Sequence, residues 1–305
     1  MNYTLHQLHV FLKVVDLQSV SRAAEALYLT QPAVSIQIKK LQNQFELPLT
    51  EIVGKKIYIT DFGNVIAEKC RSIVTTAEEI KMMAADYKGM ITGKLKFSVV
   101  STGKYVMPFF LKSFMDTYPG IDISIDVSNR NTVVNDLQKN QTDFALVSVI
   151  PKSIKLNKIE LMENRLYFMG KNTEENKIEK VKDLEKVNLL FREEGSATRT
   201  VMESYLTTHK IQVKNTMELV SNEAIKQAIY ADIGFSLMPI IGLRGALNTE
   251  EVKIYPLKGL PIVTQWNLVY LSEKKKTPAH QAYEDYLLKN KDKLVQENFE
   301  WSLAY

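Results

Sequence analysis

Three short runs of hydroxyl-bearing and basic side chains in the later two-thirds of the chain could hold a small anion. They are Ser101-Thr102-Gly103, Ser128-Asn129-Arg130 and Gly195-Ser196-Ala197-Thr198. Each run follows an expected strand or begins an expected helix, where main-chain amides without a helical partner attract carboxylate or phosphate. A helix cap is the alternative for any single serine or threonine. Their joint placement at the ends of expected strands favours a ligand site.

Basic residues near these runs would strengthen an anion site, because they donate charge-assisted hydrogen bonds. Four of them lie within or beside the runs: Lys104, Arg130, Arg192 and Arg199. The residues expected to contact the ligand are Ser101, Thr102, Lys104, Ser128, Asn129, Arg130, Ser148, Arg192, Ser196 and Thr198.

Basic side chains also cluster within the first sixty residues. The net charge of +4, from 39 basic and 35 acidic residues, is too small to indicate a nucleic-acid partner by itself. The pairs Lys39-Lys40 and Lys55-Lys56 give local positive density, to which a phosphate backbone responds more than to the total charge. An exposed Ile36 beside them suits the major groove, because apolar groups can contact thymine methyls. These residues predict a DNA-binding surface.

Two helices are expected to support that surface. Leu5, Leu8, Leu12 and Val15 recur at helical spacing and predict a first helix whose stripe faces inward. Ser19 or Ser21 can cap a second helix, which continues through residues 23–27.

A third helix would present the surface itself. Thr30 is a good cap for it, and Pro32 is tolerated because amides of the first turn have no intrahelical partner. Its buried face is expected to carry Val34, Ile38, Leu41 and Phe45. Residues 55–60 then predict a hairpin, or wing, with lysines at its tip. A helix pair in any all-α domain, with Ile36 in a protein contact, is the alternative to a recognition helix.

The residues expected to contact DNA are those expected to be exposed on the second helix, the third helix and the wing. They are Ser21, Arg22, Thr30, Gln31, Pro32, Ala33, Ser35, Ile36, Lys39, Lys40, Lys55 and Lys56.

One long helix is expected over residues 62–87, which contain no proline. Apolar residues within it form two series, each with an interval of seven residues, as in a coiled-coil seam. They are Ile66, Ile73 and Ile80 in the first series and Cys70, Ala77 and Ala84 in the second. The pattern predicts a dimer, which would place two DNA-binding units on two half-sites. A helix that lies on its own protein core is the alternative. Cys70, the single cysteine, is expected to be a packing residue.

The remaining residues alternate between strand and helix patterns, which predicts an α/β domain with a mainly parallel sheet. The first set comprises strands at 94–100, 121–127 and 144–150 with helices at 107–118 and 132–140. The second set begins near Leu166 and comprises strands at 189–191, 217–220 and 235–238 with helices at 198–209 and 222–230. A return strand at 265–271 and a closing helix at 278–289 follow. Two sheets joined near Leu161 and Val263 would form a hinged pair of lobes.

Several classes of protein are disfavoured. A single cysteine excludes an intrachain disulfide framework, and neither a secretory start nor a membrane-spanning run is found, so a cytoplasmic protein is expected. The four histidines show no metal-ligand spacing, Gly195-Ser196-Ala197 is not a nucleophile elbow, and no dinucleotide fingerprint occurs. Neither an enzyme nor a cofactor is therefore expected. A solute-binding protein would explain the later domain but not the DNA-binding start.

The N-terminal motifs resemble the helix-turn-helix of LysR-type transcription regulators. The similar runs are residues 21–27, 29–35 and 37–41, SRAAEAL, LTQPAVS and QIKKL. Three residues depart from the family pattern, Glu46 where glycine is usual, Thr50 where phenylalanine is usual and Ile52 where arginine is common. These departures concern how the wing packs and one phosphate contact.

The later motifs resemble the subgroup that regulates carbon-fixation (RuBisCO) operons. They are the runs at residues 99–105, 128–130, 191–199 and 221–228, together with Ile36. The resemblance implies an N-terminal winged helix-turn-helix (1–61), a dimerising linker helix (62–91) and a two-lobed α/β effector domain (92–305) of the type 2 periplasmic-binding-protein fold. Lobe I would comprise about 92–161 and 266–305, and lobe II about 162–265.

The same resemblance implies partners. Double-stranded promoter DNA, RNA polymerase and a small effector between the lobes are expected, in a homotetramer built as a dimer of dimers. Ser101 matches a position that holds the effector through a hydroxyl. The subgroup implies a phosphorylated sugar, a reduced nicotinamide nucleotide or a related anion. A non-phosphorylated or unrelated effector stays open as the alternative.

Overall fold

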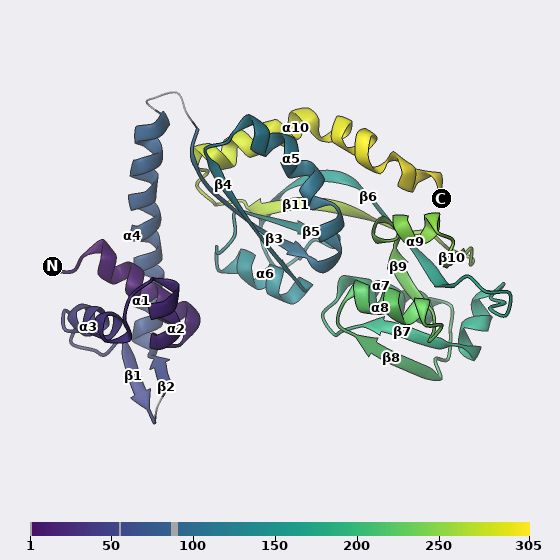
Figure 1. The fold of residues 1–305 in the computed structure, drawn as a ribbon, viewed down its shortest axis with the longest axis horizontal. Helices are drawn as coiled ribbons and strands as arrows, with labels where there is room; N and C mark the ends of the chain where they lie inside the picture. Colours follow the sequence, from purple (N-terminus) through teal and green to yellow (C-terminus); the bar gives the residue numbers. More distant parts are fainter. Residues whose placement is uncertain (1, 55, 87–90) are drawn as a thin grey trace. The chain divides into compact units, whose positions relative to one another are not determined.

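The computed structural model describes residues 2–54, 56–86 and 91–305, with side chains 78, 79 and 81–86 left out. The chain divides into two compact units, Met1–Met90 and Ile91–Tyr305 (Figure 1). Among the described residues, no helix combines the length and apolar character that crossing a membrane requires.

The first unit contains three short helices, a hairpin and a long helix. They are α1 (Leu5–Leu17), α2 (Val20–Ala26), α3 (Gln31–Gln42), β1 (Thr50–Val53), β2 (Lys56–Ile59) and α4 (Asp61–Asp86). The predicted caps are confirmed for two helices: the Ser19 hydroxyl accepts from the Arg22 amide, and the Thr30 hydroxyl accepts from the Ala33 amide. Pro32 lies in the first turn of α3, as predicted. Local chemistry therefore fixes where α2 and α3 begin.

Two packing predictions for this unit are wrong. Leu5 is 52% exposed, because the buried stripe of α1 begins one turn later, at Leu8, and includes Phe11. Phe45 does not extend the buried face of α3, since that helix ends at Gln42. It is half-buried in the following loop and stacks near Tyr3.

The long helix α4 confirms the predicted linker over its described residues; Tyr87 lies outside them. Cys70 is buried in the unit's own core, against the cluster that contains Leu12, so it is a packing residue as predicted, but within its own chain and not in a seam between two chains. Ile66 is half-buried against the same core. Further along the helix, Ile73 and Ile80 are 41% and 65% exposed. Ala77 is half-buried, and the side chain of Ala84 lies outside the description.

The second unit is built on strands β3 to β11. Their bounds are β3 (Gly93–Val100), β4 (Ile121–Ser128), β5 (Phe144–Val147), β6 (Leu156–Lys171), β7 (Asn188–Arg192), β8 (Asn215–Leu219), β9 (Ser236–Pro239), β10 (Val252–Tyr255) and β11 (Ile262–Leu271). Seven of them form one sheet in the order β10-β6-β11-β5-β3-β4, with β9 also paired to β6. Strands β7 and β8 pair separately, in parallel, and a bridge between Leu189 and Phe235 connects them towards β9.

The prediction that two sheets are joined by crossings is wrong about how the lobes are connected. β6 has 16 residues and pairs antiparallel with β11 from Leu166↔Ile262 to Leu156↔Leu271. The two long strands run through both halves of the unit, so one seven-stranded sheet extends through both lobes and β7 with β8 forms a separate pair in lobe II. The predicted parallel pairing is confirmed for β3 with β4 and for β3 with β5. The other pairings described in this sheet, β10 with β6, β6 with β9, β6 with β11 and β11 with β5, are antiparallel, so the prediction of a mainly parallel sheet is wrong.

Helices cover this framework in two lobes. They are α5 (Met107–Thr117), α6 (Arg130–Gln138), α7 (Ala197–Thr208), α8 (Asn222–Tyr230), α9 (Arg244–Asn248) and α10 (Pro278–Phe299), with 3-10 turns η1 (Ser101–Tyr105), η2 (Val181–Lys186), η3 (Ile240–Gly242) and η4 (Glu300–Ala304). We use lobe I for the part around β3, β4, β5, α5, α6 and α10, and lobe II for the part around β7 to β10 and α7 to α9. Figure 1 shows α5 and α10 on one face of the lobe I strands and α6 on the other.

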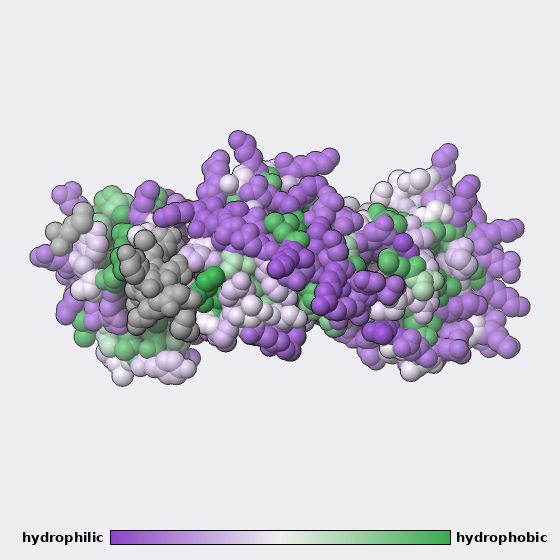
Figure 2. Space-filling view, turned by 90° about the horizontal axis from the view of Figure 1, so that it is seen from above, coloured by the Kyte–Doolittle hydropathy of each residue, from purple (hydrophilic) through white to green (hydrophobic). Residues whose placement is uncertain are grey.

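Each lobe buries its own apolar side chains. The largest core lies in lobe I around Phe97, Phe114, Phe144 and Tyr283. Lobe II holds two smaller clusters, one on each side of its strands. On the face seen in Figure 2, hydrophilic residues cover most of the second unit and apolar residues are scattered among them. The lobes are thus separate cores that share the strands β6 and β11.

Candidate functional site

The predicted ligand residues meet in a crevice between the two lobes. Seven of the ten line it: Ser101, Thr102, Asn129, Arg130, Arg192, Ser196 and Thr198. Val100, Glu193 and Ala197, which were not predicted, complete the lining. Lys104, Ser128 and Ser148 do not line it. The crevice combines the ends of β3 and β7 with the starts of α6 and α7.

Helix starts supply hydrogen-bond donors to this crevice. On the lobe I side, the Asn129 side chain caps α6 by accepting from the Thr132 amide at 2.9 Å. On the lobe II side, Ser196 stands at the start of α7, and its side chain makes no capping bond. Its buried hydroxyl and the first amides of α7 are therefore available to an anion.

Gly195 lets the two lobes approach closely beside this helix start. Its φ is +84°, and an added Cβ would lie 2.6 Å from Nδ2 of Asn131 in lobe I. A residue with a side chain would be strained at this φ and would push the exposed Asn131 side chain aside.

Arg192, the last residue of β7, crosses the crevice. Its side chain is 2% exposed. Nη2 donates to Oγ of Ser101 at 2.9 Å, and Nη1 donates to Oδ1 of Asn222 at 2.6 Å. Nε and Nη2 also donate to the two carboxylate oxygens of Glu193, both at 2.8 Å. One guanidinium therefore joins the end of β3 in lobe I to β7 and α8 in lobe II.

A second contact between the lobes lies beside the first. Oη of Tyr105 in η1 donates to Oε1 of Glu223 on α8. Burial, together with this bond to a carboxylate, raises the pKa of Tyr105 well above its usual value, so the phenol stays protonated. Lys104, expected at the ligand, lies instead with its Nζ 4.0 Å from Glu223.

Two buried donors have no partner among the residues that the structure describes: one lines the crevice and the other belongs to Asn222, which holds Arg192 beside it. Among the described residues, Nε of Arg130 and Nδ2 of Asn222 are both buried without a hydrogen-bond acceptor. Arg130 also has no ion pair with any described acid. Buried donors are normally satisfied, so this pair indicates a place for an acceptor-rich ligand or water. The free space is small, about 10 Å³.

Glu193 and Asn222 are the polar residues of this site that the sequence did not reveal. Glu193 follows the last residue of its strand, and successive side chains of a strand point to opposite faces, so adjacency to Arg192 predicted no contact. Asn222 is 30 residues from Arg192 and looked like an ordinary helix start.

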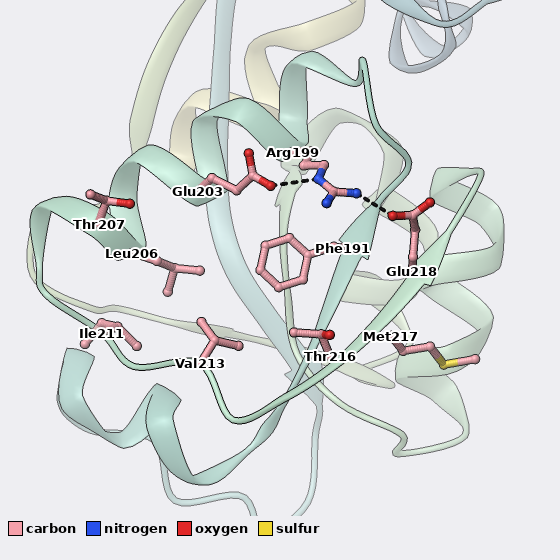
Figure 3. A pocket seen from close by; sticks show the side chains of 10 residues that line it. All are labelled: Phe191, Arg199, Glu203, Leu206, Thr207, Ile211, Val213, Thr216, Met217 and Glu218. Atoms are coloured by element: carbon pink, nitrogen blue, oxygen red, sulfur yellow. Dashed lines mark hydrogen bonds and ion pairs between the residues drawn. The ribbon is translucent and has the colours of Figure 1, made fainter.

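A larger cavity of about 320 Å³ lies in lobe II between α7 and the β7–β8 pair (Figure 3). Leu206, Ile211 and Val213 form part of its apolar wall. Arg199 was expected to add charge to the crevice; it lines this cavity instead and pairs with Glu203 and Glu218. Two carboxylates against one arginine repel an anion. The crevice, with two arginines and one carboxylate among its lining residues, attracts one.

The candidate DNA surface in the first unit is the outer side of α3. Ile36 is 53% exposed, and Lys39 and Lys40 are exposed without an ion pair to any described residue. Nε2 of Gln31 donates to Oγ of Ser35 at 3.1 Å, which orders the first turns. Exposed lysines can bind DNA phosphates, and an apolar side chain beside them can contact thymine methyls.

The remaining predicted DNA contacts surround α3. Ser21, Arg22, Thr30 and Pro32 are exposed, and Ala33 is half-buried. Lys56 is exposed at the start of β2, whereas Lys55 lies outside the described residues. The wing itself is confirmed as an antiparallel hairpin from Thr50↔Ile59 to Val53↔Lys56.

Comparison with known families agrees with both units. Residues 5–64 match the bacterial regulatory helix-turn-helix proteins of the lysR family, and residues 88–292 match the LysR substrate binding domain. The chain belongs to the LysR family of bacterial transcription regulators. It is thus a DNA-binding regulator with an effector-binding domain, and the LysR relatives below are named as regulators rather than enzymes.

Two LysR relatives match along nearly their whole length. The HTH-type transcriptional activator CmpR of Synechocystis sp. is 33% identical over 289 residues, 94% of this chain and 95% of that protein. A RuBisCO operon transcriptional regulator of Acidithiobacillus ferrooxidans is 32% identical over 288 residues, 93% of each. The predicted resemblance to regulators of carbon-fixation operons is confirmed.

Two solved LysR structures are similar. The regulatory domain of CcmR from Synechocystis PCC6803, in complex with 2-PG, gives a TM-score of 0.61 at 29% identity and covers 68% of this chain and 99% of that one. Full-length CbnR complexed with its target DNA gives a TM-score of 0.66 at 19% identity, over 94% of this chain and 99% of that one. The second likeness concerns the fold alone.

Proposed function

We propose that this LysR regulator binds a small phosphate-bearing anion in the crevice between its lobes and responds by altering its hold on promoter DNA. One observation carries the effector proposal: two arginines, Arg130 and Arg192, line the crevice with one carboxylate, and Nε of Arg130 is buried there without an acceptor among the described residues. Charged donors in a partly buried site bind anions more strongly than the same groups in water.

The phosphate class is supported by the donors and by the relative. Ser101, Ser196 and the first amides of α7 add neutral donors to the arginines, and a phosphate offers several acceptor oxygens to them. The CcmR domain was solved with 2-PG. A non-phosphorylated carboxylate is the second candidate, because it could use the same fork of Arg192. The crevice must open to admit either ligand, since its present free space holds about one water.

Calorimetric titration of the full chain with 2-PG, inorganic phosphate and acetate tests this proposal. The Arg130→Gln variant should lose at least tenfold in affinity for 2-PG, because its guanidinium has no acid partner to release. Lys139→Gln, at the other end of α6 and exposed, removes the same charge and should change affinity less than threefold. Equal losses of affinity in both variants would show that only the net charge of the protein matters. Acetate binding without phosphate binding would favour the carboxylate class.

We propose that α2, α3 and the wing contact the DNA through the twelve residues predicted above. The triple variant Ser35→Ala, Ile36→Ala and Lys39→Ala should weaken binding to the chain's own upstream DNA by at least tenfold. It should also reduce the salt dependence of binding by about one phosphate contact. Lys69→Ala, an exposed lysine on α4, is the matched control. Unchanged affinity and selectivity in a folded triple variant would rule out this surface.

We also propose a homotetramer, acting on RNA polymerase in the bacterial cytoplasm, in which α4 pairs two chains. Ile73, Ala77 and Ile80 lie on the part of α4 that does not pack in the unit's own core. Exposing the apolar side chain of Ile80 to water is unfavourable, and a second helix would cover it. Sedimentation of an Ile73→Asp, Ile80→Asp variant should show a smaller assembly than the unchanged chain. An unchanged assembly would place the contact elsewhere.

A further inference from the structure

The Arg192 fork, which the proposed function assigns to an anion, is already occupied. Glu193 accepts from both Nε and Nη2 at 2.8 Å, the bidentate arrangement that a bound carboxylate or phosphate would adopt. The two residues are adjacent in the chain, so this acid is permanently tethered at the site. Its side chain is 15% exposed. Glu193 thus stands where the charge of a ligand would be.

Counting donors shows how fully Arg192 is used. A guanidinium has five N–H donors. Two point to Glu193, one to Ser101 and one to Asn222, which leaves a single N–H. An incoming anion can therefore gain the side-on, two-point contact with Nε and Nη2 of Arg192 only by displacing Glu193.

The same guanidinium fastens the lobes. Its bond to Ser101 and the bond of Tyr105 to Glu223 both join lobe I to lobe II. With these bonds in place, the crevice has about 10 Å³ of free space. A turn of Arg192 from Glu193 towards an incoming anion would change its bond to Ser101, which is one of the contacts between the lobes.

We propose that Glu193 is an internal competitor of the effector, which neutralises Arg192 and keeps the crevice closed until an anion replaces its carboxylate. This inference rests on the proposed function of the crevice. It makes effector binding an exchange: one carboxylate leaves the fork, one external anion enters, and the Arg192–Ser101 bond is released in the same step. The effector then binds one arrangement of the lobes better than the other, as coupling to DNA requires.

Substitution of Glu193 distinguishes two roles for this residue, competition with the effector for Arg192 and positioning of Arg192. Glu193→Gln keeps an acceptor for Arg192 but removes the competing charge, and it should bind 2-PG at least tenfold more tightly in calorimetry of the full chain. Glu194→Gln removes the same charge from the next residue, which is exposed, and should change affinity less than threefold. Glu193→Asp keeps the net charge but shortens the side chain, so it should also bind more tightly than the unchanged protein.

The outcomes distinguish this inference from the proposal beneath it. If the unchanged chain binds 2-PG and Glu193→Gln binds it equally or more weakly, Glu193 is a positioning residue for Arg192 and the inference is wrong while the proposed function stands. If Glu193→Gln and Glu194→Gln gain equally, net charge explains the gain and the inference is again wrong. If neither the unchanged chain nor any variant binds 2-PG or inorganic phosphate, both fail. Thermal melting of each variant, measured alongside, confirms that it folds.

Discussion

Replacing Arg192 by methionine should destabilise the second unit strongly, and a second substitution should rescue it. Arg192→Met removes the guanidinium and leaves the carboxylate of Glu193 without its two 2.8 Å bonds. It also frees the oxygen of Asn222, a residue only 3% exposed. Both acceptors then remain in a crevice with little room for water.

The expected cost follows from that burial. Removing one partner of a buried ion pair costs about 3–5 kcal/mol, because the remaining charge is uncompensated. Glu193 keeps 15% of its side chain exposed and recovers part of its hydration. We therefore expect the lower end, about 3 kcal/mol. Adding Glu193→Gln removes the stranded charge and should restore about 2 kcal/mol of it.

Urea unfolding followed by tryptophan fluorescence measures this effect in the full chain. The sequence has two tryptophans, Trp266 and Trp301, and both lie in the second unit, so the signal reports that unit. Arg192→Met should unfold at lower urea than the unchanged protein, and the double variant should lie between them. A single variant as stable as the unchanged chain, or a double variant no better than the single one, would refute the reasoning from a stranded carboxylate.

Two further predictions concern the second unit. Burial lowers the pKa of His280 to about 4, from an ordinary value near 6.5, so the unfolded chain alone gains a proton in this range. Stability should fall by roughly 3 kcal/mol as the pH drops from about 6.5 to about 4. His280→Phe, which keeps the aromatic stacking on Phe144, should flatten that part of the stability profile; an unchanged slope would assign it to other groups. Trp301→Ala should cost about 2 kcal/mol by urea unfolding, because this half-buried ring packs against cores of both lobes and lies 5.3 Å from the Arg244 guanidinium. No loss would mean that η4 does not brace the lobes.

Local signals in the sequence predicted local structure well. Thr30 and Pro32 fixed the start of α3, because capping and the missing proline amide act within one turn. The hydroxyl runs at residues 101–103 and 195–198 were expected at strand and helix ends, and the structure brings both into one crevice. Each of these features depends on only a few neighbouring residues.

Features set by distant partners were not predictable in the same way. Leu5 fitted the helical period, but which part of a stripe is buried depends on where the other helices pack. Cys70 fitted a seam and is instead buried by α1 and its neighbours. The continuity of β6 depends on ten residue pairs with β11, about one hundred residues away. The ion pairs of Glu193 with Arg192 and of Arg199 with Glu218 depend on side-chain positions that are set only in the folded chain.

Anion binding in the crevice should change the affinity of the protein for DNA, and one measurement tests that coupling directly. Fluorescence anisotropy of the chain's own upstream DNA, with nuclease footprinting of the same complexes, each with and without saturating 2-PG, should show a change in affinity or footprint for the unchanged protein. The Arg130→Gln variant should bind the DNA equally well and show no response at the same 2-PG concentration. If 2-PG binds the unchanged protein by calorimetry yet alters neither affinity nor footprint, or if Arg130→Gln responds fully, the crevice does not control DNA binding.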